Sequence, residues 1–396
     1  MPADWRATLT ASTRYANIER IAAAVASKDP KKETTAQQEA FDIESRAFDT
    51  SCTRDDYDQA CELASRTRPF LETSLAFTPL RRATSSPGPT IGKYKNCTEV
   101  GVGLTSTVYH SPGTNDPNPL SERGYALKVV HTNPPEPHNP VREIRTLKSL
   151  AHESIITLSD AFQDSDGQHV LVFPFKPMSL LQVLGAGAPI PVKKIRSIMR
   201  DVLAGLAYIH SRGIIHRDIK PSAILFDGPD GPACLTDFGT IWHPAYSPVS
   251  EPADSKILDI GTGPYRPPDA LLGNKSYSTP VDIWSLGVVL SELASLSPKP
   301  TPIFTSPPTH EDGSQLGLIL SIFRTLGTPT RETWPEAAAF RTTPFGMWKV
   351  FERREDVFGG VRTEFRELVD AMLKYESRAR VTAEEALEHK CLSQQP

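Results

Sequence analysis

The sequence predicts an α+β fold, in which a small β-rich lobe is followed by a larger helical lobe and preceded by an N-terminal appendage. Three observations lead to this prediction. Short runs of β-forming residues dominate from residue 91 to 175, helical periodicity dominates within residues 176–396, and residues 1–90 show neither pattern strongly. The chain of 396 residues is long enough for one large domain of two lobes with additional segments.

Residues 1–90 form the predicted appendage. They are polar, carry only short helical patterns such as Ile18, Ile21, Ala22 and Val25, and end in the breaker-rich stretch "RRATSSPGPT". Two interpretations are open for this segment: two or three weak helices followed by a linker, or disorder.

The β-rich lobe is predicted from four runs that suit a small antiparallel sheet: "YKNCTEVGVG", "STVYHS", "GYALKVV" and "HVLVFPF". Between the second and third runs, Pro112 to Gly124 contain many turn-forming residues. We expect them to form an exposed loop inserted in a hairpin.

The helical lobe is predicted from two long segments. "VDIWSLGVVLSELASL" is apolar on nearly every face and is expected to form a helix at the centre of the lobe. Residues 192–211 are expected to form a buried amphipathic helix, because apolar residues recur three and four positions apart: Ile195, Ile198, Met199, Val202, Leu203, Leu206 and Ile209. The change from strands to helices predicts a cleft near Phe173 to Pro177, where ligands commonly bind.

Composition argues against several classes of function. With 43 basic and 47 acidic side chains the net charge is -4, so no global positive field attracts nucleic acid or an acidic membrane. The five cysteines are scattered and predict neither a disulfide framework nor a zinc site. A membrane span needs about 18 apolar residues, and no apolar run comes close to that length. The first thirty residues do not resemble a secretion signal. We therefore expect a soluble protein, cytoplasmic or nuclear, with no nucleic-acid or membrane partner.

The stretch "GVGLTSTVY" has a Gly-rich pattern with Ser106 at the third glycine position. Glycines let backbone N–H groups approach phosphates closely, although an ordinary hairpin turn gives the same pattern. Lys128 follows inside the apolar run "ALKVV", and Glu143 lies beside the predicted helical stripe of "PVREIRTLKSL". A buried lysine needs a partner, and Glu143 is the candidate; two surface charges are the alternative.

Two further stretches carry acidic residues where chain direction changes. In "IIHRDIKPSAILF", Asp218 lies between two short apolar runs, where it can accept a proton from a substrate hydroxyl, and Lys220 can neutralise a transferring phosphate. In "CLTDFGT", Asp237 is suited to holding Mg²⁺ against phosphates. Cys234 beside it is expected to be a buried packing thiol.

In this order and at these intervals, the Gly-rich turn, Lys128, Glu143, "HRDIKP" and "DFG" resemble the eukaryotic protein kinases. "GTGPYRPPDALLG", "DIWSLG" and Arg380 agree, and the resemblance runs from about Ile91 to His389. It implies a bilobal protein-kinase fold and a Ser/Thr kinase that uses ATP and Mg²⁺.

The resemblance also implies roles for particular residues. Lys128 would hold the α and β phosphates, Glu143 would orient Lys128, Asp218 would be the base with Lys220 beside it, and Asp237 would bind the metal. Phe173 would be the gatekeeper, while Pro174 and Lys176 would offer a backbone C=O and N–H to adenine. The implied nucleotide contacts are Gly101, Val102, Gly103, Val108, Ala126, Lys128, Phe173, Pro174, Lys176 and Leu225.

Within the family, "IFRTLGTPTRETWP" and Arg266 are similar to the cyclin-dependent kinases. One departure is Ala223, which stands where the family has an asparagine that binds a second Mg²⁺ and braces the loop. Three interpretations follow: a slower enzyme relying on the metal at Asp237, a pseudokinase that binds nucleotide as a scaffold, or a lineage with a substitute ligand.

Other departures concern regulation. Ile257 occupies the place of the activating threonine, so Glu251, Asp254 or Asp259 is a candidate to meet Arg217 instead, and Ser255 is a candidate phosphorylation site. Leu104 and Thr105 replace the inhibitory Thr-Tyr pair, and "PHNPVREI" departs from the cyclin-binding helix.

These features resemble the fungal kinases that activate cyclin-dependent kinases. Such an enzyme would phosphorylate the activation loop of a cyclin-dependent kinase as a single chain, with no evident need for a cyclin. Asp269 replaces the usual glutamate opposite Arg380, which is expected to give either a looser pair or a harmless variant.

Overall fold

A computed structural model describes residues 21, 43–44, 46–48, 51, 53–66, 88–103, 105–112, 123–132, 134–247, 249–305, 313–346 and 349–393. The chain divides into two compact units. One comprises Met1–Ser74 with Pro307–Ser314, and the other comprises Leu75–Ser306 with Gln315–Pro396. The predicted boundaries at residues 90 and 175 remain predictions.

The described part of the first unit contains helix α3 (Arg54–Arg66). Thr53 and Asp56 cap its start reciprocally: the Asp56 N–H donates to Thr53 Oγ1 at 3.2 Å, and the Thr53 N–H donates to the Asp56 carboxylate at 2.9 Å. Tyr57 is buried and donates its hydroxyl to Glu44 Oε1 at 2.5 Å. Of the predicted helical pattern near the N-terminus, only Ile21 lies within the described residues.

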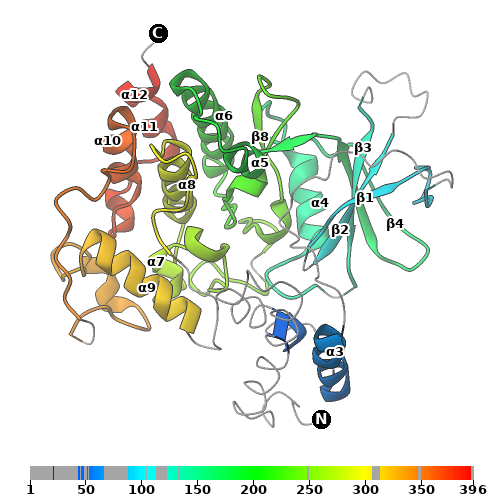
Figure 1. The fold of residues 1–396 in the computed structure, drawn as a ribbon, viewed down its shortest axis with the longest axis horizontal. Coiled ribbons are helices and arrows are strands. Elements are labelled where there is room, and N and C mark those ends of the chain that lie inside the picture. The colour runs from blue at the N-terminus through cyan, green and yellow to red at the C-terminus, as the bar shows by residue number, and fades with distance from the viewer. Residues whose placement is uncertain are drawn as a thin grey trace. The chain divides into compact units, whose positions relative to one another are not determined.

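The small lobe of the second unit is an antiparallel sheet, of which Figure 1 labels strands β1 to β4. Its five strands follow the order β1-β2-β3-β5-β4. Its strands are β1 (Thr98–Val102), β2 (Ser106–Ser111), β3 (Tyr125–Val130), β4 (Asp160–Gln163) and β5 (His169–Pro174). The four predicted runs each contain one of these strands, and β4 was not predicted. The predicted insertion after β2 lies mostly outside the described residues.

Helix α4 (Pro140–Ser149) lies beside this sheet in Figure 1. Asn139 caps its start by accepting the Arg142 N–H at 2.9 Å, and Pro140 supplies a fixed φ at the first helical position. Arg142, Glu143, Thr146 and Leu147 are its buried residues, so the buried face follows the helical repeat.

The larger lobe is helical, as predicted. Helix α6 (Val192–His210) matches the predicted helix, and all seven residues predicted to be buried are buried. Helix α8 (Pro280–Leu293) is buried from Val281 to Leu293, which confirms the predicted central helix, and it contacts α10 (Thr363–Met372). The other helices are α5 (Leu180–Gly185), α7 (Pro268–Leu271), α9 (Gly313–Leu326), α11 (Ala383–Leu387) and α12 (Lys390–Ser393).

A second small sheet, of β6 (Met178–Ser179), β7 (Ile224–Phe226) and β8 (Ala233–Leu235), forms part of the larger lobe. Short 3₁₀ turns η4 (Pro221–Ala223) and η5 (Phe238–Thr240) flank β7 and β8. The described residues of the larger lobe contain three more such turns, at 263–265, 335–339 and 377–379. None of the helices in the described ranges is long and apolar enough to cross a membrane.

Candidate active site

Strand β3 and helix α4 bring Lys128 and Glu143 together. Lys128 Nζ donates to Glu143 Oε1 at 2.8 Å and to Oε2 at 3.1 Å. The side chains are only 13% and 3% exposed, so the alternative of two surface charges is wrong. Burial opposes charging of Lys128, but the charges of Glu143 and Asp237 outweigh it and raise the lysine pKa.

Asp237 is the second partner of Lys128, with Nζ 3.0 Å from Oδ1. It follows β8 with φ 64°, a left-handed conformation that turns the chain into η5. The nearby ammonium of Lys128 lowers the pKa of Asp237, and this effect exceeds the opposing effect of burial. The carboxylate is therefore ionised and available as an oxygen ligand.

Asp218 lies in the loop between α6 and η4, close to Lys220 and Thr262. Lys220 Nζ donates to Asp218 Oδ2 at 2.5 Å and to Thr262 Oγ1 at 3.1 Å. The Thr262 hydroxyl donates to Asp218 Oδ1 at 2.7 Å. Burial of Lys220 favours its neutral form, but the charges of Asp218 and Asp237 prevail and raise its pKa. The sequence had assigned Thr262 no part in this group.

Asp282 on α8 fixes the backbone of this loop. Its carboxylate accepts the N–H groups of His216 and Arg217, each at 2.8 Å. Arg217 has a left-handed φ of 72°, so the loop is bent directly before Asp218. The sequence identified the central helix but missed Asp282, although an acid at the start of an otherwise apolar helix was a usable signal.

Ala223 ends the 3₁₀ turn that follows Lys220, and it is completely buried. Its backbone N–H donates to Lys220 O at 2.9 Å, and its C=O accepts the Thr236 N–H at 3.0 Å. The backbone therefore braces the loop against the segment that carries Asp237. The methyl side chain provides no metal ligand.

Asp237 is the residue predicted to bind a metal, and its ionised carboxylate is compatible with that prediction. Within the part of the chain that the structure describes, no group of three or more acidic, histidine or cysteine side chains could hold one. Mg²⁺ commonly uses one or two carboxylates and completes its coordination with substrate phosphates and water. The residues present thus fit one metal held by Asp237 and phosphates, and they lack the usual side chain for a second.

Most of the predicted nucleotide contacts lie on neighbouring strands of the small-lobe sheet. Val108 on β2 is opposite Lys128, and Ala126 on β3 is opposite Phe173 on β5. Gly101 and Val102 lie on β1, and the Gly103 N–H donates to Ser106 O at 2.8 Å to close the turn. Phe173 is buried, and Leu225 lies on β7. Leu104 falls outside the described residues.

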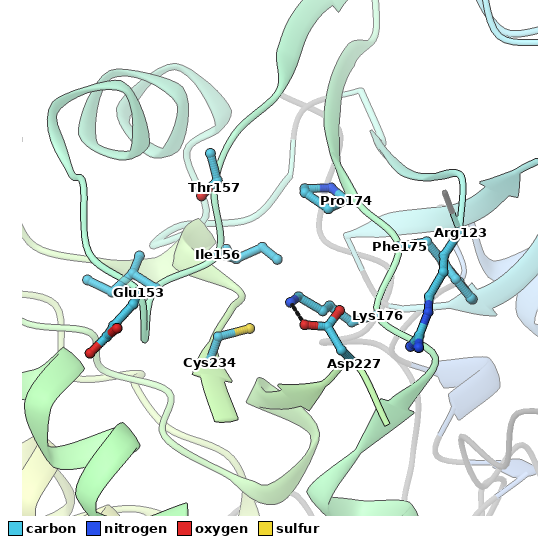
Figure 2. A pocket seen from close by; sticks show the side chains of 10 residues that line it. Arg123, Glu153, Ile156, Thr157, Pro174, Phe175, Lys176, Asp227 and Cys234 are labelled. Carbon is cyan, nitrogen blue, oxygen red and sulfur yellow. Dashed lines mark hydrogen bonds and ion pairs between the residues drawn. The ribbon is translucent and has the colours of Figure 1, made fainter. Parts of the chain in front are cut away.

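A cavity of about 310 Å³ lies against the segment after β5. Figure 2 shows the Lys176–Asp227 ion pair in it, with Nζ 2.5 Å from Oδ2, and Cys234 close by. Its lining includes Pro174 and Lys176 but not Lys128, Asp218 or Asp237. Burial raises the pKa of Cys234 to about 11, so the thiol stays protonated, as expected of a packing residue.

Of the candidates to meet Arg217, the structure selects Glu251. Its Oε1 lies 2.7 Å from Arg217 Nη1, and both side chains are buried. Asp259 instead pairs with Arg266 at 2.6 Å, while Asp254 and Ser255 are exposed.

The pair of Asp269 and Arg380 is closed and fully buried. Arg380 Nη2 lies 2.7 Å from Asp269 Oδ2, and the side chains are 0% and 1% exposed. The shorter aspartate therefore reaches its partner, and the expected looser pair is not seen.

Comparison with known proteins identifies the family of this chain. The family model described as "Protein kinase domain" matches residues 94–392, and the chain belongs to this family. Among solved structures, the crystal structure of the yeast RNA Pol II CTD kinase CTDK-1 complex is similar, with 26% identity and a TM-score of 0.61. The match covers 80% of this chain and 98% of that chain.

The predicted bilobal kinase fold is thus confirmed. A protein kinase domain implies a phosphotransferase that uses ATP and a divalent metal.

Proposed function

We propose that this protein is a serine/threonine kinase that transfers the γ-phosphoryl group of ATP to a protein hydroxyl. The observation that carries the proposal is the arrangement of Lys128, which contacts both Glu143 and Asp237. A lysine held in this way presents its charge beside an ionised carboxylate, as phosphoryl transfer requires.

The chain's own residues supply the base and its positioning. Asp218 would accept the proton of the substrate hydroxyl, and the Thr262 hydroxyl and Lys220 ammonium orient its two oxygens. The charge of Lys220 would also stabilise the transferring phosphoryl group, while Lys128 would hold the α and β phosphates. A divalent metal, Mg²⁺ by our assignment, would bind Asp237 and neutralise phosphate charge.

Ala223 favours a second candidate function, that of a scaffold that binds nucleotide without efficient turnover. A methyl group cannot replace a metal-binding amide. Against this, the backbone bonds of Ala223 already brace the loop, and Lys128, Asp218 and Asp237 are retained. We therefore favour an enzyme that works with one metal.

The substrate proposal has two parts. The departures at Ile257 and in "PHNPVREI" suggest a kinase that acts on the activation loop of a cyclin-dependent kinase without a cyclin of its own. The similarity to a CTD kinase adds a second candidate substrate, a CTD peptide of RNA Pol II, and favours action in the nucleus.

Asp218→Asn tests the function. The change keeps the size of the side chain and removes the base, so the rate of phosphoryl transfer should fall about 100- to 10,000-fold. ATP affinity, measured by calorimetry, should change little, because Asp218 is assigned to the hydroxyl rather than to the nucleotide. An unphosphorylated cyclin-dependent kinase and a CTD peptide would be offered separately. Equal transfer by the variant and the wild type would refute the assignment of the base.

A further inference from the structure

A buried group of charges joins residues 241–262, which we call the activation segment, to helix α4 and to the loop between α6 and η4 that carries Asp218, which we call the catalytic loop. We define the Glu251 cluster as Arg142, Arg217, Glu251 and Lys256, all of which are buried. Glu251 Oε1 lies 2.7 Å from Arg217 Nη1, and Oε2 lies 3.7 Å from Arg142 Nη1. One carboxylate thus lies between guanidinium groups from two separate elements.

Each arginine of the cluster is the sequence neighbour of a proposed catalytic residue. Arg142 precedes Glu143, which holds Lys128. Arg217 precedes Asp218 and has a left-handed φ of 72°. Restraining these two guanidinium groups therefore restrains the backbone beside both halves of the proposed site.

The carboxylate also orders the activation segment. Glu251 Oε1 accepts the Ile257 N–H at 2.8 Å. The Ile257 C=O accepts the Tyr277 hydroxyl at 2.6 Å. Ile257 occupies the position where the resemblance places an activating threonine, and its backbone is held from both sides without a phosphate.

The cluster contains three cations and a single carboxylate, which contacts the two arginines, and aromatic rings lie beside the cations. Lys256 Nζ lies 4.7 Å from the centre of the Trp242 ring and 5.4 Å from that of Tyr277. The Arg217 guanidinium lies 5.9 Å from the Tyr277 ring. Cation–π contacts stabilise buried cations. The cluster therefore keeps an excess of positive charge, part of which these ring contacts stabilise.

We propose that Glu251 is a positioning residue that holds Arg142 and Arg217 in the arrangement needed for phosphoryl transfer, so that the activation segment works without being phosphorylated. This role rests on the proposed kinase function. It adds to that function the prediction that the kinase is active while its activation segment is unphosphorylated.

The first test compares the full chain before and after treatment with a protein phosphatase, with mass spectrometry to verify that the activation segment carries no phosphate. We expect the treated wild type to keep its full rate. A rate that collapses on treatment and returns on phosphorylation of the segment would overturn the role of Glu251 and leave the proposed function intact.

The second test is Glu251→Gln, which keeps the shape and the acceptor for the Ile257 N–H but removes the charge. Two buried arginines then lie near each other without an anion, and their repulsion should displace the loop that carries Asp218. We therefore expect kcat to fall about 100-fold. KM for ATP should change less than kcat, since Glu251 does not line the nucleotide site and is linked to Lys128 only through Arg142 and Glu143. Glu251→Asp should restore part of kcat, and Asp254→Asn, which removes an exposed acid from the same segment, should have no effect.

Amide exchange at Ile257 separates positioning from general stability. We expect a lower thermal midpoint in Glu251→Gln, because two buried arginines lose their counter-charge. At a temperature where both proteins are fully folded, we expect faster exchange at Ile257, because a neutral amide oxygen is a weaker acceptor than a carboxylate. Full kcat in Glu251→Gln would overturn the proposal. A wild type that transfers phosphate to no substrate would contradict the proposed function itself, and this role with it.

Discussion

At the scale of single residues, Ala223 is the departure that most affects the expected chemistry, because its methyl group stands where the family has a metal-binding asparagine. It is buried, and both of its backbone hydrogen-bonding groups are used within the loop. The backbone of Ala223 therefore braces the loop, as the asparagine would, but its side chain cannot bind a metal. Because Asp237 is then the one side chain assigned to the metal, we expect an active site that binds Mg²⁺ weakly.

Ala223→Asn should restore the missing oxygen ligand. We expect the Mg²⁺ concentration needed for half-maximal transfer to fall about tenfold, or the rate to rise about tenfold. This is the lower end of the effect that side chains around a metal have on its affinity or on activity. The measurement is the Mg²⁺ dependence of transfer in both chains. Identical curves would mean that the site has adapted around the alanine.

The buried pair of Asp269 and Arg380 allows a prediction about stability. Asp269→Asn leaves the Arg380 guanidinium buried without a counter-charge, which should lower the free energy of unfolding by about 3 kcal/mol in urea titrations. Glu367→Gln is the matched control, because Glu367 pairs with Lys390 at 2.6 Å on the exposed surface. That change should leave the free energy of unfolding unaltered, and an equal loss in both variants would contradict the argument.

The sequence located Lys128, Glu143, Asp218 and Asp237 because their motifs are local. It did not locate Thr262 as a partner of Asp218, since 44 positions separate the two residues. The sequence likewise left Glu251, Asp254 and Asp259 as alternative partners of Arg217. Spacing along an irregular segment does not say which carboxylate turns inward, and the backbone of Ile257 makes that choice by bonding to Glu251.

At the scale of elements, the long periodic segments were predictable and the short ones were not. Helices α6 and α8 follow directly from their apolar patterns. Strand β4 was missed because it has four residues, pairs only with β5, and has no alternating pattern of buried residues. An edge strand of this kind is defined by its neighbour more than by its own sequence.

The packing of α8 against α10 depends on Gly287. A Cβ at this position would lie 2.8 Å from Met372 Cβ and 3.0 Å from Leu373 Cδ2. Gly287→Ala should therefore lower the free energy of unfolding by about 1–3 kcal/mol, as overpacking of a core does. Gly185→Ala is the control within helix α5, because a Cβ there meets nothing within 4 Å. Equal stability of the two variants would contradict the predicted close packing.

At the scale of the whole molecule, the kinase domain brings together what the sequence spreads over a long interval. Lys128 and Asp237 are 109 positions apart, yet they meet at 3.0 Å across the junction of the two lobes. The predicted two-lobe architecture explains this contact, since strand β3 belongs to one lobe and the segment after β8 to the other. The central claim is that these residues still catalyse although Ala223 has removed one metal ligand.

The measurement that tests this claim most directly is a Mg²⁺ titration of γ-phosphoryl transfer by the full chain, with nucleotide binding followed in the same samples. An unphosphorylated cyclin-dependent kinase, a CTD peptide and a generic basic protein would serve as acceptors. We predict transfer that rises with Mg²⁺ and is lost in Asp218→Asn. Nucleotide that binds at every Mg²⁺ concentration while no acceptor gains phosphate would contradict the account and identify the chain as a scaffold.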